Sequence, residues 1–227
     1  MSGYLKSYVA AAMEKDPAAT SKIMVLFTYP GVKALMWHRP ANWCYRHKMK
    51  FLARVISQHV RFWTGIEIHP GATIGKGVFI DHGAGVVIGE TAEVGNNVTL
   101  YQGVTLGGTG KDAGKRHPTI EDNVVIAAGA KVLGPCAVGK GSKIGAGSVV
   151  LKPVPENCTV VGVPGRIVKQ DGKRVDSLNQ VELPDPVLEE LRRINARLTQ
   201  IENLSGINCS RYSIANEENT KSTETTD

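Results

Sequence analysis

The first candidate for chemistry in this chain is a histidine that stands beside carboxylates. His82 directly follows Asp81, and Glu67 lies fifteen residues earlier. A neutral imidazole can take a proton from a hydroxyl near pH 7, and a carboxylate against the ring can orient it. Such a pair would act as a general base. Because a lone histidine is more often structural, this interpretation depends on whether the fold brings the residues together.

A second candidate is the segment 107–118, Gly-Gly-Thr-Gly-Lys-Asp-Ala-Gly-Lys-Arg-His-Pro. It contains four glycines, three basic residues and one histidine, and it interrupts an otherwise regular pattern. Loops on a rigid scaffold often carry functional residues. The alternative is a solvated excursion without a role, but the composition of the segment favours a function.

The elements that must position these residues follow a six-residue repeat between Ile68 and Val154. Small or β-branched residues such as Ala72, Ala84 and Val98 stand four positions after most of its aliphatic residues. The aliphatic positions, with a two-residue slip and one break, are Ile68, Ile74, Ile80, Val86, Ile88, Val94, Leu100, Leu106, Ile120, Ile126, Val132, Val138, Ile144 and Val150.

This period is neither helical nor that of an ordinary strand. It predicts a β-solenoid, in which each short strand points one aliphatic side chain inward and the chain then turns a corner. A β-sandwich with coincidental spacing is the alternative, and fourteen aliphatic positions in register disfavour it. If one coil takes about three hexapeptides, Glu67 and His82 can meet on adjacent coils.

Helices are predicted on both sides of the solenoid. Four of them, at 4–15, 20–28, 31–38 and 42–63, would form a cap over one open end, the third ending before Pro40. A helix after Asp185-Pro186 carries a heptad seam of Val187, Leu191, Ile194, Leu198 and Ile201. That seam would pair with other chains or pack on its own subunit. The expected division is 1–63 cap, 64–168 solenoid, 169–204 linker and helix, and 205–227 disordered tail.

Composition excludes several classes of protein. Lys and Arg exceed Asp and Glu by 27 to 21, an excess too diffuse to indicate nucleic-acid binding. The chain has no long apolar run and no signal-peptide pattern at its start, so no membrane association and a cytoplasmic location are expected. Four widely spaced cysteines indicate neither a zinc ribbon nor a disulfide framework.

Longer runs of the sequence resemble the serine O-acetyltransferases, a family of hexapeptide-repeat acyltransferases. The similarity covers about residues 4–168. It is carried by Ile68-His69-Pro70-Gly71-Ala72, Ile80-Asp81-His82-Gly83, Val87-Ile88-Gly89-Glu90-Thr91, residues 102–111, Arg116-His117-Pro118 and residues 145–150. The resemblance implies a left-handed parallel β-helix with three faces. It also implies transfer of an acetyl group from acetyl-CoA to the hydroxyl of L-serine, giving O-acetylserine for cysteine synthesis, and no metal is expected.

The resemblance also implies roles for individual residues. His82 matches the catalytic base, and Glu67 stands where better-known members have aspartate, so the carboxylate is kept one methylene longer. Matches to serine-binding residues are Asp81, Asp16, Arg116 and His117. Matches to the CoA channel are Gly108, Thr109, Ala128 and Ala146, with Lys143 and Lys152 toward its phosphates. None of the four cysteines matches a site position, so direct transfer in a ternary complex is expected.

Assembly and partners are likewise implied by the resemblance. The chain looks like the short bacterial type, because it lacks most of the N-terminal extension that joins two trimers in longer members, so a plain homotrimer is expected. L-cysteine is the expected feedback inhibitor. In the family's complex with O-acetylserine sulfhydrylase, a terminal isoleucine enters the partner's active site. This chain ends at Asp227, and weak or no binding is expected because a second charge would have to be desolvated.

Three other functions remain open at this point. A γ-type carbonic anhydrase has the same scaffold and would need three imidazoles about 2.0–2.1 Å from zinc. His69, His82 and His117 are available for that purpose. A sugar O-acetyltransferase would run the same chemistry on a different acceptor. A non-enzymatic scaffold is disfavoured by the pairs Asp81-His82 and Arg116-His117.

Overall fold

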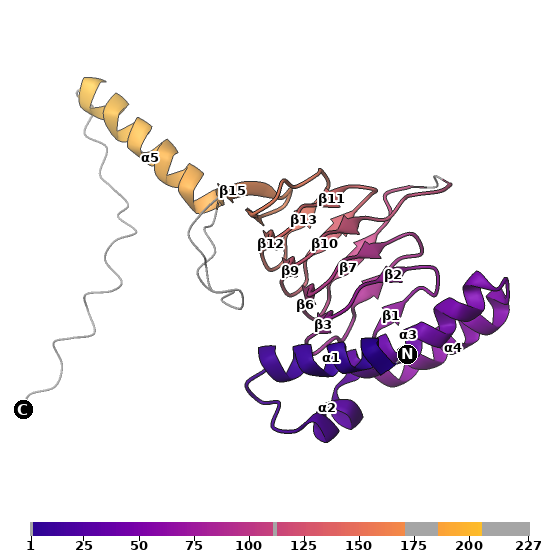
Figure 1. The fold of residues 1–227 in the computed structure, drawn as a ribbon. Helices are drawn as coiled ribbons and strands as arrows, with labels where there is room; N and C mark the ends of the chain where they lie inside the picture. The colour runs from indigo at the N-terminus through magenta and orange to yellow at the C-terminus, as the bar shows by residue number, and fades with distance from the viewer. Residues whose placement is uncertain (1, 111–112, 171–185, 206–227) are drawn as a thin grey trace, which may run out of the picture. The chain divides into compact units, whose positions relative to one another are not determined.

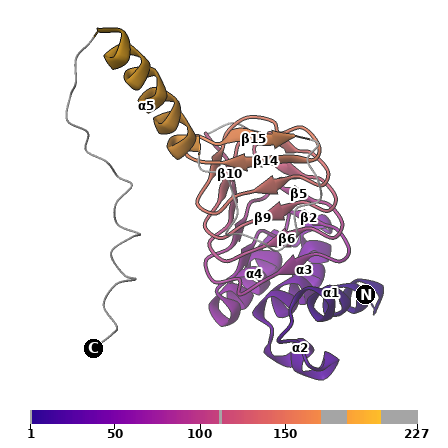
Figure 2. The ribbon, with the colours of Figure 1, turned by 90° about the vertical axis from the view of Figure 1, so that its left-hand side faces the viewer.

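The computed structural model describes residues 2–110, 113–170 and 186–205. The chain divides into two compact units, Met1–Pro186 and Val187–Asp227. In the first unit, helices lie at one end of a stack of short strands (Figure 1), and the turned view shows the strands one above another in successive coils (Figure 2). Helix α5 (Pro186–Ser205) supplies the described part of the second unit. Among the described residues, no helix has the length and apolar character needed to cross a membrane.

Within the described residues the strands form three sheets, and neighbours in a sheet come from successive coils. Sheet A contains β1 (Glu67–Ile68), β4 (Val87–Ile88), β7 (Thr105–Gly107), β10 (Lys131–Leu133) and β13 (Val149–Val150). Sheet B contains β2 (Thr73–Ile74), β5 (Glu93–Val94), β8 (Thr119–Ile120) and β11 (Ala137–Val138). Sheet C contains β3 (Phe79–Ile80), β6 (Thr99–Leu100), β9 (Val125–Ile126), β12 (Lys143–Ile144), β14 (Cys158–Val161) and β15 (Arg166–Gln170). The coils pair in parallel, and only the final pair, β14 with β15, is antiparallel in this part of the chain.

The aliphatic column predicted from the repeat is confirmed. All fourteen aliphatic positions of the repeat are buried, and Ile68, at 6% exposure, is the most accessible of them. Each such side chain stabilises the fold by about 1.5–3 kcal/mol relative to exposure. Of the small residues in the repeat, Ala72 and Val98 are buried, but Ala84 is exposed. Val86 instead fills the internal small-residue position two before Ile88, so the slip falls within residues 81–85.

Two coils are longer than the others, and both carry candidate site residues. A regular coil spans 18 residues, as between paired Val87 and Thr105 in sheet A. The spacing is 20 between Glu67 and Val87, and 26 between Thr105 and Lys131. The extra residues lie at the turn that holds His82 and in the glycine-rich segment 107–118. The fold therefore departs from its repeat at the two places where the sequence predicted function.

Residues 2–64 form the cap as four helices: α1 (Ser2–Lys15), α2 (Lys22–Thr28), α3 (Pro30–Arg46) and α4 (Lys50–Thr64). Several backbone N–H groups of the first coil donate to the second coil, as from Glu67 N to Val86 O, whereas carbonyls at other positions of the first coil face the cap. Cap side chains donate to these carbonyls: Ser57 Oγ to Ile68 O at 2.9 Å, Asn42 Nδ2 to Pro70 O at 2.8 Å and Tyr8 OH to Gly75 O at 3.2 Å. The cap thus satisfies groups that an open sheet edge would leave unpaired.

The predicted break before Pro40 was wrong, since α3 continues through that proline to Arg46. The helices instead separate at residues 47–49, where Lys48 has a positive φ of 65°. The side chains of His38 and Asn42, on either side of the proline, both contact Ala72 O. These tertiary contacts hold the helix together where proline removes one of its hydrogen bonds. The expected division of the chain into four parts stays a prediction, because cap and solenoid share one core and residues 206–227 lie outside the described part.

His38 predicts acid sensitivity of the cap. Its ring is buried between α3 and the first coil, with Nε2 3.2 Å from Ala72 O, and burial lowers its pKa from 6.5 to about 4. Between these two pKa values, the His38 ring is protonated in the unfolded chain but stays neutral in the folded chain. Stability is therefore fully present above pH 6.5 and falls by about 3 kcal/mol on approach to pH 4. Thermal unfolding of His38→Gln, which keeps a donor without titrating, should show a smaller loss between pH 7 and 5; an unchanged loss would contradict this assignment.

Candidate active site

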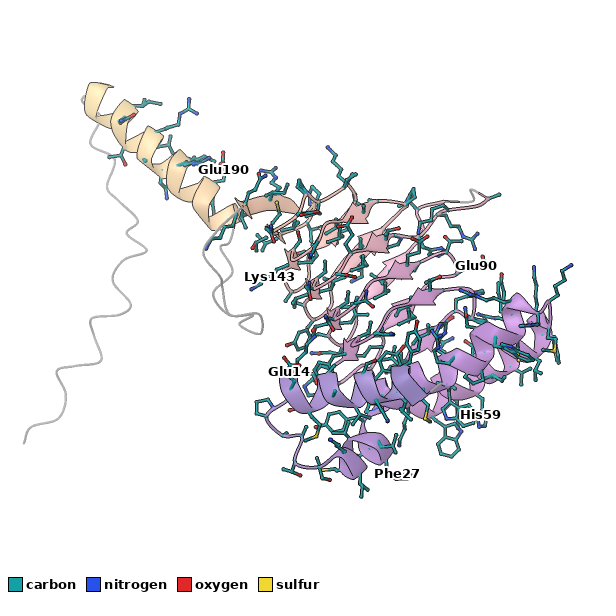
Figure 3. The ribbon with its side chains drawn as sticks, viewed as in Figure 1. Glu14, Phe27, His59, Glu90, Lys143 and Glu190 are labelled. Atoms are coloured by element: carbon teal, nitrogen blue, oxygen red, sulfur yellow. The ribbon has the colours of Figure 1, made fainter. Side chains whose placement is uncertain are left out.

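Most of the candidate site residues lie along two different edges of the three-sided solenoid. We call the turns from sheet C to sheet A the CA edge, which comprises residues 81–86, 101–104, 127–130 and 145–148. The turns from sheet A to sheet B form the AB edge, which comprises residues 69–72, 89–92, 108–110, 113–118, 134–136 and 151–153. Figure 3 shows Glu90 of the AB edge and Lys143, just before a CA turn, on opposite sides of the stack.

On the CA edge, the cap and the first coil bring together an acidic group around His82. Tyr29 OH donates to Asp16 Oδ2 at 2.5 Å, and His82 Nε2 lies 4.0 Å from Asp81 Oδ2. The pKa of Asp81 is raised, first by burial and further by the Asp16 carboxylate, while His82 opposes the rise. The hydrogen bond to Asp16 raises the pKa of Tyr29 to about 12. Two nearby carboxylates make this corner suited to a cationic group such as an ammonium.

His82 itself is held outward by an unusual backbone. It has a positive φ of 56°, and its side chain is 76% exposed, so it is not a structural core histidine. Glu67 lies on the outer face of sheet A, where Oε2 is 3.0 Å from Arg61 Nη1. Among the described residues no hydrogen bond or ion pair joins Glu67 to His82. In the single chain, therefore, the expected base and its expected carboxylate have different partners.

A strip of glycines continues along the CA edge beyond His82. Gly85, Gly103, Gly129 and Gly147 all have φ between 66° and 73°, a conformation that glycine adopts without a steric penalty. Successive turns are joined by backbone hydrogen bonds, such as Gly129 N to Gln102 O and Gly147 N to Ala128 O, both 2.8 Å. Ala128 and Ala146 belong to these turns. The strip presents almost no side chains, and an extended ligand can therefore approach its backbone closely.

On the AB edge, a carboxylate and a phenol fix Arg116. Arg116 Nη2 pairs with Glu90 Oε2, and Tyr45 OH donates to Glu90 Oε1 at 2.6 Å. The hydrogen bond from Tyr45 and then that from Arg116 lower the pKa of Glu90, which is therefore ionised near neutrality. The guanidinium is only one-third exposed and is held from one side. Its remaining N–H groups can bind a second carboxylate.

Thr91 fixes the ring of His117 beside Arg116. The Nδ1 atom of His117 accepts from Thr91 N at 3.2 Å and lies 2.9 Å from Thr91 Oγ1. The neutral ring therefore carries its proton on Nε2 and can donate from there. Burial, and next the Arg116 charge, lower the pKa of His117, which favours this neutral form. A Cβ at Gly89 would lie 1.9 Å from the His117 ring, so only glycine fits there.

The residues predicted for CoA follow the same division between edges. Ala128, Ala146 and the adjoining Lys143 lie at the CA edge. The AB edge has Gly108, Thr109 and the exposed Lys152. Gly108 packs against Arg116 O, and Thr109 lies next to Gly134, where an added Cβ would be 3.4 Å from its Oγ1. In one chain, therefore, half of the predicted serine-binding residues and half of the predicted CoA-binding residues lie at the CA edge. The other half of each group lies at the AB edge.

Sequence reasoning missed four residues that hold the site. Glu90 and Thr91 stand in a run that carried the resemblance, but without a role, and only their contacts with Arg116 and His117 give them one. Tyr29 and Tyr45 come from the cap, and no local pattern places them near the solenoid. In the described part of the chain, no three histidine, cysteine or acidic side chains are grouped so as to hold a metal ion.

Comparison with known proteins agrees with this architecture. The family described as bacterial transferase hexapeptide (six repeats) matches residues 117–152. A serine acetyltransferase of Bacillus licheniformis is 59% identical over 198 residues, which cover 87% of this chain and 92% of the relative. A Brucella abortus strain S19 serine acetyltransferase solved in complex with coenzyme A has a TM-score of 0.73 and 45% identity over 76% of this chain and 69% of its own. A soybean enzyme complexed with serine has a TM-score of 0.71 and 47% identity over 73% and 68%.

The solenoid, its edge sites and the hexapeptide match define a hexapeptide-repeat transferase built on a left-handed parallel β-helix with a helical cap, as expected from the sequence. At nearly 60% identity over most of both chains, the sequence belongs to the serine acetyltransferase family. It is therefore an acyltransferase, and the carbonic anhydrase and scaffold alternatives are set aside.

Proposed function

We propose that this enzyme transfers the acetyl group of acetyl-CoA to the hydroxyl of L-serine, with His82 as general base and Glu67 as its orienting carboxylate. The observation that carries the proposal is that one edge of the solenoid holds an acidic corner and another holds a fixed arginine, the two groups that an amino acid needs. The ammonium of serine binds Asp16 and Asp81, and its carboxylate binds Arg116 and His117. Cysteine biosynthesis in the cytoplasm is the proposed setting.

In this mechanism His82 takes the hydroxyl proton as the serine oxygen attacks the thioester carbon. A bond forms between that oxygen and the acetyl carbon, and negative charge develops on the thioester oxygen. Backbone N–H groups of the glycine-rich segment that contains Gly108 stabilise that oxygen. The intermediate then expels the CoA sulfur, which takes the proton from the imidazolium. No cysteine carrier is required, so the transfer is direct.

We further propose that the complete site lies between neighbouring chains of a homotrimer. Because sheet A separates the CA edge from the AB edge, one chain offers its base and its arginine at different places. Around a three-fold axis, the CA edge of each chain faces the AB edge of the next, which makes three identical sites. The high exposure of His82 in the single chain fits this arrangement, since the neighbour would cover it. Closure also brings a second surface toward Glu67, which can turn its carboxylate from Arg61 to the imidazole.

Coenzyme A is proposed to lie along the same junction. The glycine strip from Gly85 to Gly147 receives the pantetheine arm, with Ala128 and Ala146 beside it. Gly108 and Thr109 of the neighbouring chain form the opposite wall. Lys143 from one chain and Lys152 from the next approach the phosphates. The proposal fits the complex with coenzyme A known for the Brucella abortus enzyme.

The acyl acceptor is tested by thiol release from acetyl-CoA in the presence of single acceptors. L-serine should support turnover, whereas sugars should not, because they offer no ammonium to Asp16 and Asp81 and no carboxylate to Arg116. L-homoserine, with one extra methylene, tests how tightly the hydroxyl is placed. Turnover confined to a sugar would show that the acceptor is wrong and that the related sugar O-acetyltransferase activity is the correct one.

The proposed dyad predicts unequal effects of two substitutions. His82→Ala should lose about 10²–10⁴-fold in kcat while coenzyme A still binds, because only the base is removed. Glu67→Gln keeps the shape and removes the charge, so its loss should be smaller but measurable. Steady-state kinetics and coenzyme A binding by calorimetry separate these effects. A fully active His82→Ala enzyme is incompatible with the mechanism, and a silent Glu67→Gln would remove Glu67 from it.

The shared site predicts complementation between two inactive variants. His82→Ala keeps an intact AB edge, and Arg116→Ala keeps an intact CA edge. When the two are unfolded and refolded together in equal amounts, about a quarter of the junctions combine both intact edges, so about a quarter of wild-type activity should return. Each variant refolded alone is the control. If no activity returns although mixed trimers form, the site lies within one chain.

L-cysteine is proposed to inhibit by occupying the serine position. It carries the same ammonium and carboxylate with sulfur in place of oxygen, so Asp81, Arg116 and His117 would bind it in the same way. Initial-rate kinetics should show competition with serine and relief of inhibition at high serine concentration. Inhibition that does not depend on the serine concentration would place the cysteine elsewhere on the molecule.

A further inference from the structure

Helix α5 carries a hydrophobic seam whose residue order is informative. In heptad notation, Leu191 and Leu198 occupy a positions, and Ile194 and Ile201 occupy d positions. These four side chains are between 47% and 60% exposed. Between Leu191 and Ile201 the other residues are polar except Ala196, and Glu190 pairs with Arg193 on the helix surface, Oε2 to Nη1 at 3.6 Å. The helix therefore presents one narrow apolar stripe and an otherwise polar surface, the pattern of a coiled-coil strand.

The order of leucine and isoleucine specifies how many strands associate. Isoleucine at a with leucine at d favours two strands, whereas leucine at a with isoleucine at d favours three or four. Helix α5 has the second order in both of its described heptads. A helix that packed on the surface of its own subunit would have no need for this alternation. This order favours the same helix from other copies of this chain as the occupant of the seam.

We propose that α5 forms a parallel three-stranded coiled coil that fastens the trimer outside its active sites. The residue order allows three or four strands, and the proposed shared site requires three chains. The choice of three strands therefore rests on the proposed function. Identical chains around a three-fold axis place their helices parallel and at the same height. Each layer then contains one residue type from three chains, first Leu191, then Ile194, then Leu198.

The coil is short, and its tethering to the solenoid would strengthen its association. The four layers span about 15 Å, so each helix contributes only four described apolar side chains to the packing that stabilises it. Once three solenoids meet, however, the attached helices reach a high effective concentration, and their association stabilises the whole assembly. The coil should thus determine how far the protein can be diluted before the trimer dissociates, and it should leave turnover within an intact trimer unchanged.

The experiment measures trimer dissociation of the full-length protein by sedimentation velocity over a dilution series. Leu198→Asp places a charge in a core layer and should make the trimer dissociate at about 10²-fold higher protein concentration. Gln200→Asp adds the same charge on the polar face and is the matched control, which should behave as wild type. At concentrations where both variants are trimeric, their turnover per chain should equal that of wild type.

A second variant tests the number of strands without changing composition. The four changes Leu191→Ile, Ile194→Leu, Leu198→Ile and Ile201→Leu exchange the order and keep the apolar surface. Circular dichroism should report the same helix content. The trimer should nevertheless dissociate at about the same protein concentration as the Leu198→Asp trimer, because the seam now favours two strands. If the exchanged seam fastens the trimer as well as wild type does, a specific three-stranded coil is excluded.

The two proposals fail in different ways. If Leu198→Asp trimers resist dilution as wild type does, while the His82→Ala and Arg116→Ala variants still complement each other, the coil is wrong and the shared site stands. If complementation fails while Leu198→Asp still weakens the trimer, the coil stands and the shared site is wrong.

Discussion

The structure depends on one stacked column of aliphatic side chains. Each coil adds three inward-facing aliphatic residues to it, and backbone N–H groups of its strands pair with the coil above, as from Glu67 N to Val86 O and from Val87 N to Val104 O. Because every layer is packed against the next, the scaffold tolerates no slip in register. Irregular residues can enter only at turns. The two insertions, at His82 and at 107–118, are such turns, and they are where the proposed chemistry would take place.

Closure of the column creates the second constraint. Some carbonyls of the first coil have no neighbouring strand to donate hydrogen bonds to them. Side chains from three helices of the cap supply the donors instead. The same docking brings Asp16 and Tyr29 to the CA edge and Tyr45 to the AB edge. The cap is therefore a structural lid and also a source of site residues. Its position ties the charge of the acidic corner formed by Asp16 and Asp81, and the orientation of Arg116, to the integrity of the fold.

Sequence alone predicts the column well, because its period is local and each position reports its own burial. It failed where tertiary contacts override local rules. Ala84 keeps the six-residue count but is displaced by the longer turn, and Pro40 stays helical because its neighbours are bound to Ala72 O. The partners Glu90 and Tyr45 are far apart in sequence and were not predicted to meet. Conversely, Glu67 and His82 were predicted to meet, but in the single chain they have different partners.

The account's central claim is that one site is built from the CA edge of one chain and the AB edge of another. A crystal structure of the trimer with coenzyme A tests it most directly. We expect the CoA sulfur near His82 of one chain, its arm along the glycine strip, and Gly108, Thr109 and Arg116 of the neighbouring chain on the opposite side. A coenzyme A molecule bound within hydrogen-bonding distance of residues from a single chain only, with His82 still exposed to solvent, would contradict the account.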